Sequence, residues 1–394
     1  MFDFYPQLKQ RFDALRTRAE FFSLRYVSEA GQYLSVRKNV AEPPAFKHDQ
    51  GAMLTVRLRG IEAYAATNDL SQTGLQAALD RAEAQAQLIA AHALLNLSQE
   101  PVSHERADYF SPNLDQAFPS LNHCFDLLAS ESAAVPKDER LVSWVVSLGL
   151  NTVEQIYLNS AGAELRQAQR FVYPGMTVTG YDGQDSQTRS LGRDNFGQQG
   201  GVDVISRCGL IGAAPNVADQ ALQLLLAPNT PAGKRDLLLM PDQMILQIHE
   251  SIGHPLELDR ILGDERNYAG TSFVKTSDFG SLQYGSSLLN VTFDPDIPEQ
   301  LASYSHDDDG TPAHKEFLIR QGVLLRPLGS ALSQFRSGLE GVANSRASSW
   351  NRPPIDRMAN LNIEPGDQSL PQLIGGIERG ILMATNRSWS IDDA

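Results

Sequence analysis

The chain has 394 residues, of which 42% are hydrophobic and 20% charged, the balance of an ordinary globular protein with more than one domain. Its formal net charge of −14 repels phosphate backbones, which argues against nucleic acid as a direct partner. The longest apolar stretch is half the length of a membrane span, and two distant cysteines fit a reducing compartment. We therefore expect a cytoplasmic protein without a membrane partner.

Residues 51–95 predict two strands followed by a helix. Residues 53–59 alternate apolar and polar side chains, which is the period of a half-buried strand. Apolar residues then recur at steps of three and four over residues 75–93, which predicts an amphipathic helix. Residues 97–120 hold three prolines among polar residues, and we expect a long connection there.

A second β-rich region follows this connection. Residues 141–146 and 155–158 predict strands, and the sequence Asn-Ser-Ala-Gly at residues 159–162 predicts a turn after the second of them. Residues 182–201 are rich in glycine, aspartate and glutamine, which indicates an exposed loop.

The best candidate for a domain boundary is the proline- and glycine-containing segment at residues 229–233. It follows a predicted helix that Asn216 caps and that ends at Leu226. We expect an α+β protein with two α/β-type domains, residues 1–230 and residues 231–394, each with mixed sheets and packed helices.

The second domain opens with a short buried strand at residues 237–240, after which Pro241 begins a helix. This helix carries the pattern H-E-x-x-x-H, made by His249, Glu250 and His254. In H-E-x-x-H metallopeptidases the two histidines bind the metal, and the glutamate takes a proton from the metal-bound water. The pattern here is one residue longer.

The longer spacing needs a local change of the helix, because side chains five residues apart on a regular helix point about 140° from each other. Gly253 and Pro255 are expected to end the helix, so that His254 leaves the helix axis and swings back beside His249. His249 shares a helix face with the apolar residue Ile252, so we expect its imidazole to point toward the core.

On spacing alone a metal site and two structural histidines are equally good interpretations. Glu257 and Asp259 are candidates to fix the imidazole tautomers, or else they are surface acids paired with Arg260. Three consecutive aspartates at residues 307–309 are expected to form a turn, because the residues after them break the spacing of a calcium loop.

The sequence of residues 249–259 fits H-E-A/S-x-G-H-x-x-E-x-D, the pattern of the metal-bearing members of the TldD/PmbA family. The chain resembles this family of metallopeptidase-related proteins, once named modulators of DNA gyrase, over nearly its whole length. The resemblance makes residues 1–230 a TldD/PmbA-like domain and residues 231–394 a metallopeptidase domain. Further matching segments are residues 49–51, 159–162, 269–273, 307–313, 357–360 and 364–366.

The resemblance implies a zinc-dependent peptidase subunit that acts on unfolded or small peptides, with His249 and His254 as metal ligands and Glu250 as the base. It also implies a PmbA-like partner subunit or a homo-oligomer around the site. The third ligand of the family, a cysteine, lies beyond the position that matches Ala394, so we expect a C-terminally truncated domain. The alternative is a non-catalytic binding or structural subunit with a vestigial metal site.

Overall fold

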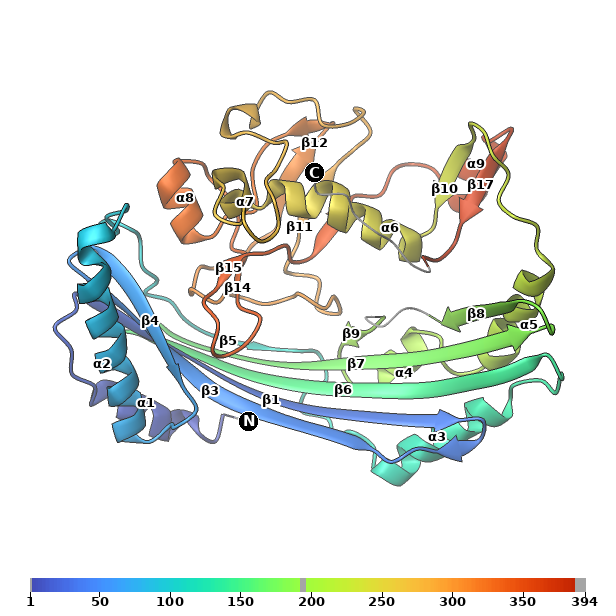
Figure 1. The fold of residues 1–394 in the computed structure, drawn as a ribbon, viewed down its shortest axis with the longest axis horizontal. Helices are drawn as coiled ribbons and strands as arrows, with labels where there is room; N and C mark the ends of the chain where they lie inside the picture. The colour runs from blue at the N-terminus through green and yellow to red at the C-terminus, as the bar shows by residue number, and fades with distance from the viewer. Residues whose placement is uncertain (1, 192–195, 387–394) are drawn as a thin grey trace.

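The computed structural model describes residues 2–191 and 196–386, and its largest feature is one long, curved sheet (Figure 1). Among these residues the sheet has nine strands, whose main path runs in the order β4-β3-β1-β6-β7-β5. Short strands β2, β8 and β9 pair with β1 and β7 at the margins. The strands are β1 Phe21–Arg37, β2 Val40–Ala41, β3 Ala45–Leu58, β4 Ile61–Thr67, β5 Arg106–Phe110, β6 Leu141–Asn159, β7 Glu164–Tyr181, β8 Ser186–Leu191 and β9 Gln198–Gln199.

Three strands of this sheet differ from the sequence-based expectation. The two predicted strands at residues 141–146 and 155–158 are parts of one strand, β6, because β1 and β7 pair with it on both sides across the polar residues between them. The turn at residues 159–162 does join β6 to β7. Within the expected connection at residues 97–120, β5 forms and pairs in parallel with β7. Within the expected loop at residues 182–201, β8 pairs with β7.

One face of the sheet is covered by helices. Side chains such as Leu24 and Leu54 pack against α1 and α2 near one end, and Leu148 and Val178 pack against α3, α4 and α5 near the other. Helix α5 begins at Ala214 with a proline in its first turn, so the expected cap at Asn216 is wrong. The helices are α1 Tyr5–Asp13, α2 Gln72–Ile89, α3 Leu121–Ala133, α4 Asp203–Arg207 and α5 Ala214–Leu226.

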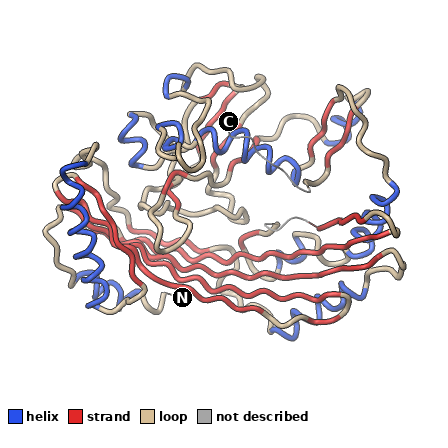
Figure 2. The backbone as a smooth tube through the Cα atoms, in the orientation of Figure 1, coloured by secondary structure: helices blue, strands red, loops and turns tan. Residues whose placement is uncertain are grey.

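The remaining chain forms a smaller body against the opposite face of the long sheet, and Figure 2 shows that much of it is loop. Its core lies between a four-stranded antiparallel sheet, in the order β13-β12-β11-β16, and the helices after residue 240. Its elements are β10 Asp236–Leu239, α6 Pro241–Ile248, α7 Leu258–Leu262, β11 Val291–Phe293, β12 Glu316–Arg320, β13 Val323–Leu324, α8 Ala331–Ser337, β14 Ser345–Arg346, β15 Ile355–Asp356, β16 Leu361–Ile363, α9 Leu370–Gly375 and β17 Gly380–Met383.

Two segments, residues 49–51 and residues 307–309, take part in the contact between the second body and the sheet. The Trp350 indole lies over Gly51, where an added Cβ would come within 2.2 Å of the ring, and its Nε1 donates to Asp49. The aspartates at residues 307–309 form the expected turn, in which Asp307 accepts from the backbone amides of Asp309 and Thr311. Taken with the sheets and helices described above, the chain has the mixed α+β fold that was expected.

The boundary between residues 230 and 231 stays a prediction, although the segment around it, residues 227–235, forms no helix or strand. The expected early end of the second domain at Ala394 lies outside the described residues. Within the part of the chain that the structure describes, every helix is too short or too polar to cross a membrane.

Candidate metal centre

The H-E-x-x-x-H pattern lies on a widened helical turn. Helix α6 ends at Ile248, and residues His249–Gly253 continue it as a π-helical turn. The backbone amide of His254 donates to the carbonyl oxygen of His249, five residues earlier. Such an i→i+5 bond brings residues five apart onto the same side of the helix, and π-helical turns occur frequently at functional sites.

The expected helix break at Gly253 and Pro255 is therefore wrong. His254 keeps right-handed helical backbone angles, with φ −58° and ψ −42°, and Pro255 lies inside a following short 3₁₀ turn. The extra residue is absorbed by a wider turn rather than by a departure from the helix axis. The two side chains nevertheless come together as the spacing argument required.

The three polar side chains of the pattern form a compact group. One ligand-type atom from each of His249, Glu250 and His254 lies within 4.8 Å of the others, and the two imidazole ring centres are 4.6 Å apart. Within residues 2–191 and 196–386 this is the one group of three or more histidine, cysteine or acidic side chains with this compactness. Two imidazoles and a carboxylate are the donor types that zinc prefers.

His249 does not point into the core, contrary to the expectation from its helix face. Its side chain is 45% exposed, and Ile252 instead packs into the core from the π-helical turn. The change of helix period at residue 249 explains the error, because the sequence argument assumed a regular helix through Ile252. Partial burial lowers the pKa of His249, and the neighbouring His254 lowers it further. A low pKa keeps this imidazole neutral, as a metal ligand must be.

Three side chains outside the pattern contact the π-helical turn and the 3₁₀ turn that follows it. Met358 packs so closely on Gly253 that an added Cβ would lie 2.4 Å from its sulfur. Tyr284 Oη donates to the carbonyl oxygen of Ser251 at 2.6 Å, and Ser272 Oγ donates to that of Pro255 at 2.7 Å. Carbonyl groups near a helix end lack intrahelical partners, and these hydroxyl groups supply them.

Glu257 contacts the His254 ring of this donor group. Its side chain is fully buried, and its Oε2 lies 2.9 Å from His254 Nδ1. It also forms ion pairs with Arg260 and Arg357, at 3.5 Å and 3.3 Å. The sequence offered Glu257 either as a partner of an imidazole or as an acid paired with Arg260. In the structure Glu257 contacts both groups.

Asp259 is neither a partner of the histidines nor a surface acid. It is buried, and its carboxylate accepts from the backbone amides of Arg260 and Asp356. Asp356 in turn accepts from the backbone amide of Asp259 at 2.9 Å. Burial raises the pKa of Asp259 to about 8, and the facing Asp356 carboxylate adds to this effect. Asp259 therefore links α7 to β15 instead of contacting the metal group.

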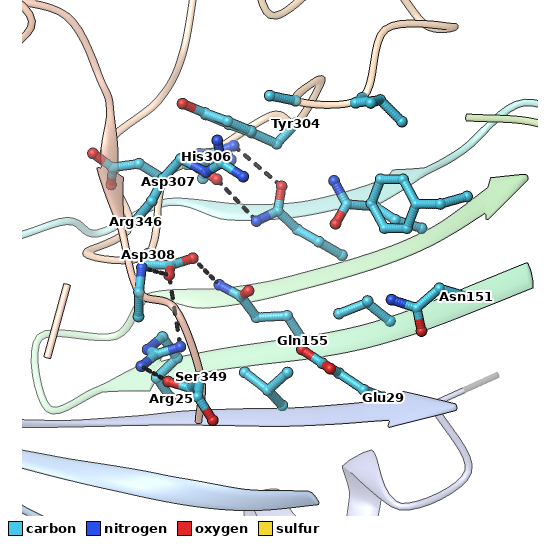
Figure 3. Close-up of a pocket in the computed structure, with 18 residues that line it drawn as sticks. Arg25, Glu29, Asn151, Gln155, Tyr304, His306, Asp307, Asp308, Arg346 and Ser349 are labelled. Atoms are coloured by element: carbon cyan, nitrogen blue, oxygen red, sulfur yellow. Dashed lines mark hydrogen bonds and ion pairs between the residues drawn. The ribbon is translucent and has the colours of Figure 1, made fainter. Parts of the chain in front are cut away.

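A cavity of about 230 Å³ lies elsewhere, between the middle of the long sheet and the second body (Figure 3). Its walls are polar side chains of β1, β6 and β7, such as Arg25 and Gln155, and residues of the loop that includes Tyr304 and Asp308. Many of these groups are used in binding the two bodies together, for example Gln155, which donates to Asp308. None of the three pattern residues lines this cavity, so the donor group is the better candidate for a metal site.

The α+β fold and the donor group define a metallopeptidase-type chain, and comparison with known proteins supports this class. Residues 22–86 match PmbA/TldA metallopeptidase domain 1, and residues 232–393 match the PmbA/TldA metallopeptidase C-terminal domain. The chain belongs to the PmbA/TldD family.

Curated relatives carry metalloprotease names. A metalloprotease of Methanothermobacter thermautotrophicus is 29% identical over 67% of this chain, and the match spans 56% of that relative's length. A metalloprotease of Synechocystis is 25% identical over 95% of this chain and 78% of its own length. A zinc metalloprotease TldD homolog of Saccharolobus solfataricus is 27% identical over 43% of this chain and 36% of its own length.

Solved structures share the fold at low identity. A protein described as a modulator of a DNA gyrase from Thermotoga maritima superposes with a TM-score of 0.73 at 16% identity, covering 98% of this chain and 83% of that one. TldE from Thermococcus kodakarensis gives a TM-score of 0.71 at 16% identity with the same coverage. These likenesses extend over both bodies of the fold.

Proposed function

We propose that this chain is a zinc-dependent peptidase subunit in which His249 and His254 bind the metal and Glu250 is the general base. The observation that carries the proposal is the convergence of two imidazoles and a carboxylate on one π-helical turn. The metalloprotease names of the relatives support the reaction class.

The chemistry of the donor set fits a zinc ion. His254 Nδ1 faces the Glu257 carboxylate, which leaves Nε2 as the nitrogen for the metal. A bound divalent ion would polarise a peptide carbonyl and make water more acidic. Glu250 is 22% exposed and lies 3.9 Å from the His249 ring, where its carboxylate can accept a proton from water and pass it to the leaving amine.

We further propose that the substrates are unfolded or small peptides and that the chain works with a PmbA-like partner subunit or a second copy of itself. The fold likeness to TldE supports an assembly of this type. A cytoplasmic location is supported by Cys124 and Cys208, which are both free thiols. Nucleic acid is not proposed as a partner because the net charge is −14.

A non-catalytic subunit with a vestigial metal site is the second candidate. It is favoured by the observation that the group contains two histidines and Glu250, so that only two ligands remain if Glu250 is reserved as the base. Such a subunit would use the same fold and surface to bind peptides or a partner without hydrolysing them.

The Glu250→Gln variant separates these candidates. The catalytic proposal expects that zinc binding persists while hydrolysis of a mixture of short peptides, followed by mass spectrometry with added zinc, falls by about a hundredfold or more. The matched control is Glu340→Gln, at a side chain that is 81% exposed, which should leave hydrolysis unchanged. Equal hydrolysis by wild type and Glu250→Gln would remove Glu250 from the mechanism, and no hydrolysis by wild type would favour the second candidate.

A further inference from the structure

The Glu257 carboxyl group has no contact with solvent, so its whole environment is made by the protein groups around it. A buried carboxylate is costly unless charged partners and hydrogen bonds replace its water. Here the partners are His254, Arg260 and Arg357 on Oε2 and the backbone amide of Met358 on Oε1. Arg357 and the Met358 amide donate hydrogen bonds to the carboxylate, and Arg260 forms an ion pair with it, so it is held from several directions.

Two of the donors come from one dipeptide about a hundred residues downstream. Arg357 places Nη1 3.3 Å from Glu257 and Nη2 2.9 Å from Glu265, so its guanidinium spans two acids. The next residue, Met358, gives its amide to Glu257 and packs its sulfur on Gly253. The dipeptide therefore contacts both the carboxylate behind His254 and the turn that carries it.

The contact between Glu257 and His254 decides which ring nitrogen carries the proton. A carboxylate only accepts, so at 2.9 Å the Nδ1 of His254 is the protonated nitrogen and donates to it. Arg260 Nη2 also lies near this nitrogen, at 3.4 Å, but an arginine cannot accept and the longer contact is the weaker one. Nε2 is then left without a proton, in the form that binds a metal.

We propose that Glu257 and Arg357 are positioning residues of the metal centre: Arg357 orients the Glu257 carboxylate, and Glu257 fixes the tautomer and direction of the His254 ring. This inference rests on the proposed function, because it assigns His254 to the metal. It gives a role to the Arg357-Met358 segment, which lies outside the H-E-x-x-x-H pattern.

The tautomer can be tested without metal or substrate. In the metal-free protein with ¹⁵N-labelled histidine, the His254 ring, assigned with a His254→Asn variant, should show a protonated Nδ1. In Glu257→Leu the acceptor is removed, and the spectrum should shift toward the Nε2-protonated form. A folded Glu257→Leu protein that keeps the wild-type spectrum would overturn the proposal.

Zinc affinity supplies the second readout. Zinc titration should show a loss of about 10- to 100-fold for Glu257→Leu. Zinc affinity should fall about tenfold in Glu257→Gln, which keeps an acceptor oxygen but no charge, and about tenfold in Arg357→Met. These two variants test the proposal if Glu257→Leu does not fold. The control is Arg326→Met, because Arg326 also pairs with two acids in the same body, Glu316 and Glu340, and is similarly buried. It should bind zinc as wild type does.

The outcomes separate this inference from the proposed function. If His254→Asn binds zinc as tightly as wild type, the metal assignment itself fails. If His254→Asn loses zinc while Glu257→Gln and Arg357→Met retain wild-type affinity and the wild-type His254 spectrum, only the positioning role fails.

Discussion

Replacement of Gly253 by alanine tests how the π-helical turn is packed. The backbone at Gly253 has φ −60°, which any residue adopts, so the glycine is not needed for its conformational freedom. An added Cβ would instead lie 2.4 Å from the Met358 sulfur, 2.6 Å from its methyl carbon and 3.3 Å from Leu361. The expected cost is that of overpacking, toward the lower end of about 1–3 kcal/mol because the end of a methionine side chain can move.

A double-mutant cycle with Met358→Ala isolates this contact. In the Met358→Ala background the clash is gone, and Gly253→Ala should be neutral or stabilising by up to about 1 kcal/mol, since alanine is the better helix former. The coupling between the two positions should therefore be about 1–3 kcal/mol, measured by urea unfolding of all four proteins. Additive effects within about 0.5 kcal/mol would refute the packing argument.

Two further predictions concern groups around the site and the sheet. Tyr284→Phe removes the donor to the Ser251 carbonyl and should lower the free energy of unfolding by about 1 kcal/mol in urea, whereas an unchanged value would mean that water replaces the hydroxyl group. Burial raises the pKa of Glu100 from 4.5 to about 7 despite its ion pair with Arg57. Between pH 4.5 and 7 the folded protein therefore holds a proton that the unfolded chain has released. Stability should therefore fall as pH rises from 4.5 to 7, and Glu100→Gln should reduce this slope in urea unfolding; an unchanged slope would exclude Glu100 as its source.

Local sequence patterns were sufficient to predict an element whose residues show its own burial period. The alternation at residues 53–59 lies in β3, and the helical period at residues 75–93 lies largely in α2, which ends at Ile89. The helical pattern describes the burial of one face, whereas in β3 the polar side chain of Arg57 is buried as well as Leu54 and Val56. Strand β5 has only five residues, and its structure depends on pairing with β7, more than fifty residues away. No local pattern could indicate that partner.

The same division applies to the candidate site. The pattern of His249, Glu250 and His254 is local and was visible in the sequence, but the way in which the helix accommodates it was not. A helix break and a π-helical turn both bring the two histidines together, and packing of Met358 and Tyr284 on the turn favours the second. The segment that includes Arg357 was noted only for its family resemblance, because its contact with Glu257 exists only in the folded chain.

Zinc titration of the histidine variants, by calorimetry on metal-free protein, tests the central claim most directly. The account predicts one zinc site in the wild type, a loss of affinity of about tenfold or more in His249→Ala and in His254→Ala, and retained binding in Glu250→Gln. His314→Ala, at an exposed histidine in the same body, is the control and should bind as wild type does. Wild-type zinc affinity in both His249→Ala and His254→Ala would contradict the account.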